Sequence, residues 1–363
     1  MSSQLLRQPA EIRFQDELQR LHEQDGNAPK PANWYLSPRS VRAFILGDEK
    51  LNVSRKFYGD DALVDRAIVT LMGKQGLMLV GEPGTAKSML SELLAAAISN
   101  DSGLTIQGTA GTTEDHIKYS WNYALLLAEG PSERSLVPSP LYQGMAAGKA
   151  VRFEEITRCP PEIQDVMVSM LSDKTMMLPE MGEGARLLAQ SGFNVIATAN
   201  LRDRGVHEMS AALKRRFNFE TVKPIQDAKF EQQLLRLQLQ QELGDMQAQV
   251  QVGDDVVDVL VTVFQELRKG VANDGTHLKK PDAVMSTAEA VNIAHAASLE
   301  AAFLGDGTVT GAALARQLRG VVLKDNDEDI ARVQYYVDAV ARERAKHDAA
   351  WKSFYEESKT LWQ

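Results

Sequence analysis

The spacing of hydrophobic positions changes twice along this chain of 363 residues. Near the start, charged side chains occupy most helical faces, and Ile12, Leu18 and Leu21 are the main apolar positions of residues 8–24. This pattern predicts a short, partly exposed helix. A linker rich in Pro, Gly and Asn follows. The pair Ser37–Pro38 then indicates a second helix start, because serine caps a helix and proline fits its first turn.

From about Phe57, short apolar runs alternate with longer helical patterns. Five short strands separated by helices are typical of a parallel sheet that is covered on both faces. The sequence therefore predicts an α/β unit of about 165 residues. The five runs are Leu77–Val80, Leu104–Ile106, Ala150–Phe153, Val195–Ala199 and Phe217–Val222.

Beyond about Pro224 the pattern is helical and no strand is predicted. Asp254 and Asp255 are expected to cap the second of three helices. Each helix is predicted from apolar residues that share one face. These residues are Phe230, Leu234 and Leu237; Val257, Leu260, Val261, Phe264 and Leu267; and Ile330, Val333, Val337 and Val340, continued by Trp351, Phe354 and Tyr355.

Composition narrows the classes of protein that fit. Apolar residues make up 44% and charged residues 25% of the chain, an ordinary globular balance. The net charge of −9 disfavours general binding to nucleic acid, because an acidic surface repels phosphates. Cys159 is the single cysteine, so no internal disulfide can form. No signal peptide and no apolar run of membrane-spanning length is present, and we expect a soluble cytoplasmic protein.

A glycine-rich octet follows the run Leu77–Val80 and precedes a helical pattern, which is the context that a phosphate-binding loop requires. Its backbone N–H groups and the helix N-terminus can surround phosphate oxygens. Lys87 supplies a cation for the β- and γ-phosphates, and the Ser88 hydroxyl can bind Mg²⁺. Ala86 stands where the general motif has glycine, and alanine is acceptable there if its φ is negative. The octet is Gly81, Glu82, Pro83, Gly84, Thr85, Ala86, Lys87 and Ser88.

Two carboxylates, Glu154 and Glu155, come directly after the predicted strand Ala150–Phe153. Catalytic groups of α/β proteins are often located at such strand ends. Glu154 can hold Mg²⁺ through water, and Glu155 can polarise the attacking water. The alternative is a solvated acidic patch. Arg152 is a charged residue within a strand that is predicted to be buried, and the sequence pattern does not explain it.

Asn200 and a group of cations complete the candidate site. Asn200 ends the predicted strand Val195–Ala199, where its amide can bind the γ-phosphate or orient water; alternatively it forms a turn. Arg215 and Arg216 end a short predicted helix ahead of the last strand. Either can act as an arginine finger on a neighbouring subunit, or both can complement the helix dipole.

These segments resemble the MoxR branch of the AAA+ ATPases over about residues 55–222. Ala-Lys in the phosphate loop is frequent in that family, Asn200 matches its sensor asparagine, and Arg215-Arg216-Phe217 matches its finger segment. Two further stretches resemble the family. They are Leu136-Val-Pro-Ser-Pro-Leu141 and Glu154-Glu-Ile-Thr-Arg-Cys-Pro-Pro161 with Gln164. Most relatives have aspartate where this chain has Glu154.

The resemblance implies an ATP- and Mg²⁺-dependent ATPase that forms a homo-oligomeric ring, expected to be a hexamer, with ATP between subunits. It also implies a chaperone-like remodeller that works with a von Willebrand A-domain partner. Two β-hairpin insertions are expected, one pairing Tyr119–Tyr123 with Leu136–Val137 and the other within Thr175–Leu188. The lid resembles the family by type only, because Met285-Ser-Thr-Ala-Glu289 has no sensor arginine and nearby Lys279 and Lys280 are no substitute.

Three other functions remain as alternatives to this interpretation, and the sequence divides into four predicted segments. The alternatives are the motor subunit of a metal chelatase, a nucleic-acid translocase and a nucleotide-dependent structural ring that scarcely hydrolyses ATP. The predicted segments are an N-terminal helical extension with a Pro-rich linker (1–54), the AAA+ α/β core (55–223), a helical lid (224–320) and a C-terminal helical extension (321–363).

Overall fold

The computed structural model describes residues 7–200, 205–245, 250–283, 285–322 and 326–360. The chain forms two compact units, one of residues 1–82 and 86–223 and the other of residues 83–85 and 224–363. This division into two units does not test the four segments expected from the sequence, which stay a prediction. Within the described residues, no helix combines the length and the apolar character needed to cross a bilayer.

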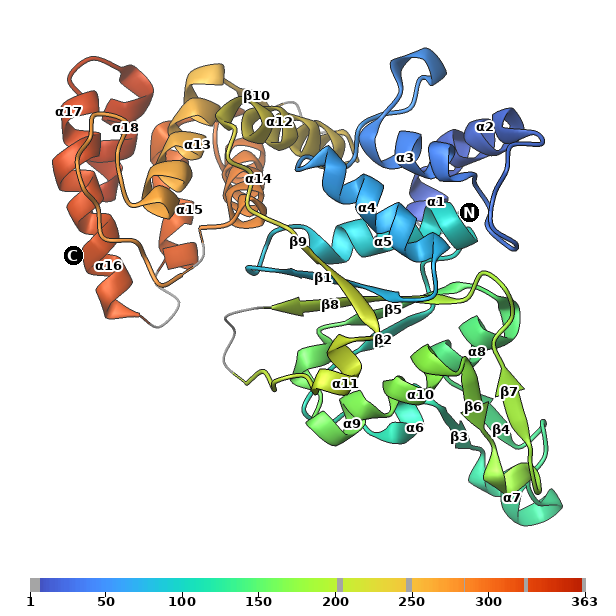
Figure 1. Ribbon diagram of the computed structural model, residues 1–363. Coiled ribbons are helices and arrows are strands. Elements are labelled where there is room, and N and C mark those ends of the chain that lie inside the picture. Colours follow the sequence, from blue (N-terminus) through green and yellow to red (C-terminus); the bar gives the residue numbers. More distant parts are fainter. Residues whose placement is uncertain (1–6, 201–204, 246–249, 284, 323–325, 361–363) are drawn as a thin grey trace. The chain divides into compact units, whose positions relative to one another are not determined.

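A five-stranded parallel sheet forms the centre of the first unit (Figure 1). All five predicted strands are confirmed, and their order across the sheet is β2-β5-β8-β1-β9. Because side chains alternate along a strand, Leu77 and Leu79 pack in the core on one face, and Met78 and Val80 pack in the core on the other. The strands are β1 (Gly76–Gly81), β2 (Thr105–Gln107), β5 (Ala150–Glu154), β8 (Asn194–Asn200) and β9 (Phe217–Thr221).

Helices cover both faces of this sheet, as the apolar strands require. One face is covered by α4, α5 and the N-terminal helices, and the other by the shorter helices between β2 and β9 (Figure 1). The first group is α1 (Ala10–Arg13), α2 (Gln15–Asp25), α3 (Pro38–Leu46), α4 (Asp61–Met72) and α5 (Lys87–Ser99), with the 3₁₀ turn η1 (Glu49–Leu51). The second is α6 (Glu114–Ile117), α8 (Pro140–Ala147), α9 (Pro161–Asp165), α10 (Met167–Ser172) and α11 (Ala211–Lys214), with η2 (Ile156–Arg158). Helix α7 (Tyr123–Glu129) also lies between β2 and β9 in the sequence, but it has no buried residue and does not cover the sheet.

The N-terminal segment belongs to the core more closely than predicted. Residues 8–24 form two helices, α1 and α2, and Leu18 and Leu21 are each 1% exposed. The predicted capping serine is confirmed, because the Ser37 side chain accepts a hydrogen bond from the backbone N–H of Ser40 at 3.3 Å. Residues 1–6 of the predicted extension lie outside the described residues.

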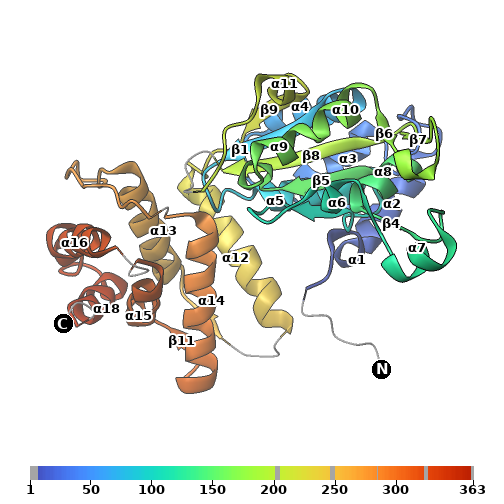
Figure 2. The ribbon, with the colours of Figure 1, turned by 90° about the horizontal axis from the view of Figure 1, so that it is seen from below.

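Both predicted hairpins are present. Strand β3 (Tyr119–Trp121) pairs with β4 (Leu136–Pro138), and β6 (Thr175–Met177) pairs with β7 (Arg186–Leu188), both antiparallel. Helix α7 lies between β3 and β4, so Tyr123 begins a helix instead of ending a strand. The Tyr119 hydroxyl donates to Glu180, in the turn η3 (Pro179–Met181), at 2.6 Å and joins the two hairpins at one end of the unit (Figure 2).

The second unit is helical around its own core. Helix α14 packs against α13 and α15, and α15 packs against α18 (Figures 1 and 2). The helices are α12 (Ala228–Asp245), α13 (Asp254–Lys269), α14 (Thr287–Leu304), α15 (Gly311–Val322), α16 (Asp327–Tyr336), α17 (Arg342–Arg344) and α18 (Ala349–Ser358), with one π-helical stretch, η4 (Val337–Ala341). Two-residue strands β10 (Gln251–Val252) and β11 (Thr308–Val309), which the sequence does not predict, pair in parallel.

Three helical predictions need correction. In α12 the buried residues include Leu235, Leu239 and the carboxylate Glu231, which pattern analysis reads as solvent-exposed. The predicted core positions were Phe230, Leu234 and Leu237, of which the first and last are 43% and 39% exposed. Asp254 and Asp255 occupy the first turn of α13 behind the N-cap Gly253, where their charges complement the helix dipole. The last predicted pattern is split between α16 and α18, because Asp348 caps a new helix.

Candidate functional site

The predicted phosphate loop joins the end of β1 to the start of α5. Lys87 opens the helix and is 7% exposed, and its Nζ donates to the backbone carbonyls of Gly81 at 3.2 Å and Glu82 at 2.7 Å. Burial lowers the pKa of Lys87, and the nearby carboxylates Glu155, Glu154 and Glu82 oppose that shift. The lysine is therefore folded into its own loop, where phosphate oxygens can replace the carbonyls as acceptors.

Ala86 departs from the expected backbone conformation. Its φ is +66°, in the left-handed region, instead of negative as the sequence interpretation requires. The position is the N-cap of α5 and follows Gly84, whose φ is +73°. An alanine in this conformation costs about 1–2 kcal/mol because its Cβ approaches the carbonyl oxygen. The loop keeps the geometry of a glycine at this position although the residue is alanine.

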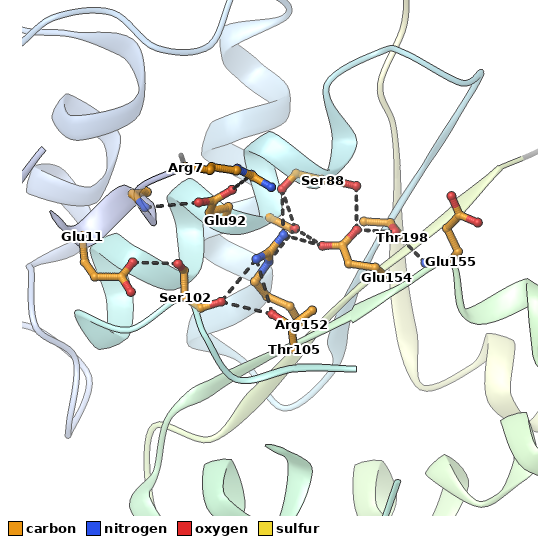
Figure 3. A network of polar contacts seen from close by, with 12 residues as sticks. Arg7, Glu11, Ser88, Glu92, Ser102, Thr105, Arg152, Glu154, Glu155 and Thr198 are labelled. Carbon is orange, nitrogen blue, oxygen red and sulfur yellow. Dashed lines mark hydrogen bonds and ion pairs between the residues drawn. The ribbon is translucent and has the colours of Figure 1, made fainter. Parts of the chain in front are cut away.

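The Glu154 carboxylate is the centre of a buried polar network (Figure 3). Ser88 Oγ and Thr198 Oγ1 each donate to Glu154 Oε2 at 2.7 Å. Arg152 Nη2 donates to Oε1 at 2.8 Å, and the Ser91 hydroxyl also donates to Oε1. Burial raises the pKa of Glu154, but the hydrogen bond from Ser91 and the charge of Arg152, with the bonds from Ser88 and Thr198, lower it below the usual value. Glu154 is thus held as a carboxylate in contact with the phosphate-loop serine.

Glu155 has a different environment. Its backbone is left-handed, with φ of +53°, and its side chain is 32% exposed and forms an ion pair with Arg158. The Glu155 backbone N–H donates to Thr198 Oγ1 at 2.9 Å, and the same hydroxyl donates to Glu154. The two carboxylates therefore differ: Glu154 is enclosed by hydrogen-bond donors, and the Glu155 side chain points away from that network and is partly exposed (Figure 3).

The order of the strands explains why these residues meet. Strand β8 lies between β5 and β1, and Asn200 at its end is paired in register with Gly81. The phosphate loop, Asn200 and the acidic pair consequently follow three adjacent strands at the edge where all three end.

The arginines lie where the strands of the sheet begin, at the opposite ends from the phosphate loop. The backbone N–H of Gly76, at the start of β1, donates to the carbonyl of Arg216 at 2.9 Å, whereas the phosphate loop follows the end of the same strand. A six-residue strand separates the two edges, which corresponds to roughly 16 Å at about 3.3 Å per residue. The structure does not bring Arg215 or Arg216 to the phosphate loop of the same chain.

The two arginines also differ from each other. Arg216 Nε donates to Ser172 Oγ at 2.7 Å, and its Nη1 donates to the Ala212 carbonyl at 3.1 Å. The Arg215 side chain is exposed, and its backbone carbonyl accepts a hydrogen bond from Gln75 at 3.2 Å. Arg216 is therefore engaged within its own chain, and Arg215 is the arginine that faces solvent.

Sequence reasoning missed the residues that support Glu154. Ser91 and Thr198 are polar residues within apolar patterns, and this interruption is the signal that could have identified them. Gly108 lies where β2 ends: its N–H donates to the Glu154 carbonyl at 2.7 Å, and a Cβ there would come within 2.3 Å of the Glu155 carbonyl oxygen. Glycine thus permits the close approach of the two strand ends.

A phosphate loop, an acidic pair and a polar strand tip on such a sheet define a P-loop ATPase domain of the AAA+ class. Residues 76–217 match the model of the AAA domain (dynein-related subfamily), and residues 229–362 match that of the YehL-like AAA+ ATPase C-terminal domain. The chain is 52% identical over 357 residues to the YehL protein of Escherichia coli (strain K12), an alignment that covers 98% of this chain and 97% of the relative. The chain belongs to the YehL family of AAA+ ATPases.

Two more distant similarities agree with this assignment. The chaperone MoxR1 of Mycobacterium tuberculosis (strain ATCC 25618 / H37Rv) is 26% identical over 169 residues, which are 46% of this chain and 41% of MoxR1. The resemblance to MoxR-type AAA+ proteins is confirmed. The crystal structure of NtrX from Brucella abortus, at 13% identity, superposes with a TM-score of 0.50 over 84% of this chain and 69% of NtrX, which supports the fold alone.

Proposed function

We propose that this protein binds ATP with Mg²⁺ and hydrolyses it between the subunits of a hexameric ring. The supporting observation is the convergence of Lys87, Ser88, the Glu154–Glu155 pair and Asn200 at the ends of three adjacent strands. In this proposal, residues 55–223 are the ATP-binding core, 224–320 the lid, and 1–54 and 321–363 the helical extensions.

The oxygen donors fit Mg²⁺. The Ser88 hydroxyl can turn a lone pair to the ion while it donates its proton to Glu154, which lies 2.7 Å away. No cluster of three or more His, Cys, Asp or Glu side chains suited to a metal exists among the described residues, as expected for an ion that is held mainly by phosphates and water. When bound, Mg²⁺ would neutralise charge on the β- and γ-phosphates.

The residues of the chain then have separate roles. The backbone N–H groups of the loop Gly81–Ser88 and the Lys87 ammonium hold the phosphates. Glu155 accepts the proton of the water whose oxygen attacks the γ-phosphorus, Asn200 orients that water, and ADP leaves. Arg215 supplies positive charge to the neighbouring subunit's γ-phosphate, because it is exposed and about one strand length from its own loop.

We test hydrolysis with Glu155→Gln, which keeps the shape of the side chain and removes the carboxylate. ATP affinity by calorimetry should be unchanged, and turnover should fall by roughly 10²–10⁴, the usual contribution of a general base. Glu49→Gln, at an exposed site in η1, is the matched control and should keep full turnover. Normal turnover in Glu155→Gln with loss in Glu154→Gln would reverse the two roles.

For the client we propose chaperone-like remodelling of a protein, with a von Willebrand A-domain protein as partner. Exposed apolar side chains on the two hairpins and α7 support a protein contact, and the net charge of −9 opposes a nucleic-acid track. These side chains are Tyr123, Leu127, Val137, Met177 and Leu188. ATPase stimulation by a von Willebrand A-domain protein would support this client; stimulation by DNA or by a metallated tetrapyrrole system would favour a translocase or a chelatase motor instead.

A further inference from the structure

Arg152 is a charged residue in the interior strand β5, between β2 and β8, and is only 9% exposed. All three of its guanidinium nitrogens are hydrogen-bonded. Nε donates to Ser91 Oγ at 3.0 Å, Nη1 to the Ser102 carbonyl at 3.2 Å, and Nη2 to the Ser88 carbonyl at 3.1 Å. Nη1 also donates to Thr105 Oγ1 at 3.4 Å, and Nη2 also donates to the carboxylate of Glu154 at 2.8 Å. A planar guanidinium so enclosed has a fixed orientation.

These contacts join the acidic strand end to the helix that follows the phosphate loop. Ser88 and Ser91 are on α5, and both also donate to Glu154, one to each carboxylate oxygen. With Thr198 as the second donor to Oε2, each oxygen of Glu154 accepts two hydrogen bonds. A carboxylate has about four acceptor sites, so the network leaves Glu154 with one well-defined position.

We propose that Arg152 is a positioning residue that holds the Glu154 carboxylate against the Ser88 hydroxyl and thereby sets the affinity of the site for Mg²⁺–ATP. The inference rests on the proposed function. Glutamate has one more methylene than aspartate, and hence more conformations, and Arg152 removes that freedom from the far side of the carboxylate. The hydrogen-bond partners of the guanidinium do not include Lys87, Glu155 or Asn200, so it acts on the site through Glu154, Ser88 and Ser91.

The experiment compares the Kd for ATP with Mg²⁺ and with EDTA, by calorimetry, in the full-length protein. In Arg152→Met the Mg²⁺–ATP affinity should fall by roughly 10- to 100-fold, the usual effect of removing a group that orients a metal ligand, while metal-free affinity changes little. Arg152→Lys keeps the charge without the fork and should recover part of the loss. A purely structural role would change both affinities together.

The double variant Glu154→Gln, Arg152→Met controls for misfolding because it removes both buried charges. Arg152→Met alone leaves a buried carboxylate without its partner. In the Glu154→Gln background, adding Arg152→Met should cause little further loss of Mg²⁺–ATP affinity. Arg268→Met, in the buried Arg268–Glu231 pair of the second unit, is the matched control and should leave the ratio of the two affinities unchanged. Wild-type protein that binds neither ATP nor ADP would refute the proposed function. If the wild-type protein prefers Mg²⁺–ATP to metal-free ATP, two results would overturn the role of Arg152. One is an equal preference in Arg152→Met, and the other is fully additive losses of Mg²⁺–ATP affinity in the double variant.

Discussion

Each unit of this protein contains a buried arginine–glutamate pair, and the two pairs differ in their neighbours. In the helical unit, Glu231 accepts hydrogen bonds from Arg268 at 2.9 Å, Gln265 at 2.9 Å and Thr287 at 2.6 Å, and it is fully buried. In the α/β unit, Glu154 is held by a comparable set of one guanidinium and several hydroxyls, and it is 5% exposed. Donor chemistry and burial are nearly the same.

The two pairs differ in the part of the fold that carries the hydrogen-bond donors of each glutamate. The partners of Glu231 are on α13 and α14, and their hydrogen bonds to Glu231 lie within the helical unit. Ser88, a partner of Glu154, ends the phosphate loop, and Glu154 ends a central strand. A buried ion pair is therefore weak evidence for function by itself. Its position at the end of parallel strands, beside a helix N-terminus, is what makes it part of a site.

The largest expected effect is on ATP turnover, and it concerns Arg215, where the strands of the sheet begin. Arg215→Ala should lower turnover by roughly 10³–10⁵ if this arginine acts on the neighbouring subunit. Arg216→Ala is the control with a smaller loss, because Arg216 is bonded to Ser172 and Ala212 of its own chain. Mixing Lys87→Ala subunits with Arg215→Ala subunits should restore part of the activity, since some interfaces then combine an intact loop with an intact finger. Mixed rings that remain inactive would show that Arg215 does not act in trans.

The pair in the helical unit should matter for folding alone. Arg268→Met leaves Glu231 buried without its counter-charge and should lower the free energy of unfolding by about 3–5 kcal/mol. Denaturant titration measures this loss, and ATP affinity is measured below the unfolding transition. The contrast between the two pairs fails if Arg268→Met weakens ATP binding while the unfolding curve stays unchanged.

Lys87→Ala tests the predicted phosphate loop, which ends at Ser88 beside the first pair. Removal of the ammonium should weaken ATP binding by about 2–5 kcal/mol, as for loss of one partner from a desolvated charge pair. Lys56 is a matched buried lysine in the same unit, bonded to Glu17 and to the Phe44 carbonyl. Lys56→Met should lower stability without changing the Kd. Equal ATP affinity in wild type and Lys87→Ala, by calorimetry, would refute the phosphate loop.

Ala86→Gly should stabilise the protein by about 1 kcal/mol, because glycine adopts the left-handed conformation without the Cβ clash. Asn100, at the other end of α5, has φ of +49°, and Asn100→Gly should give a smaller gain because asparagine tolerates this conformation. Thermal unfolding compares the two variants. A loss of stability in Ala86→Gly would mean that the alanine methyl packs favourably enough to offset its strain.

The smallest expected effect is at the far end of the Glu154 network. Ser102 Oγ donates to Glu11 of the N-terminal helix at 2.6 Å, whereas Arg152 uses the Ser102 carbonyl (Figure 3). Ser102→Ala should therefore cost about 0.5 kcal/mol of stability, the low end of the net contribution of a hydrogen bond, and leave Mg²⁺–ATP affinity unchanged. A weakening that matches Arg152→Met would instead connect the N-terminal segment to the site.

Much of the α/β unit was predictable because its signals are local. The apolar runs predict all five strands, and the octet before Met89 predicts the phosphate loop, since strand, loop and helix follow one another directly. The buried face of α12 was not predictable in this way. Glu231 is charged, so a pattern of apolar positions assigns it to solvent, and only its bonds to Arg268 and Thr287 make burial favourable.

The sequence by itself determined the order of the site's parts: a phosphate loop, an acidic pair and a polar strand tip, each placed by local periodicity. The tertiary structure decided which of them meet, because the strand order β5-β8-β1 differs from the order along the chain. It also placed Arg152 and Thr198 around Glu154, and it put Arg215 where the strands begin, away from the phosphate loop. These features depend on contacts between distant segments, and no local pattern of hydrophobic and polar residues encodes such contacts.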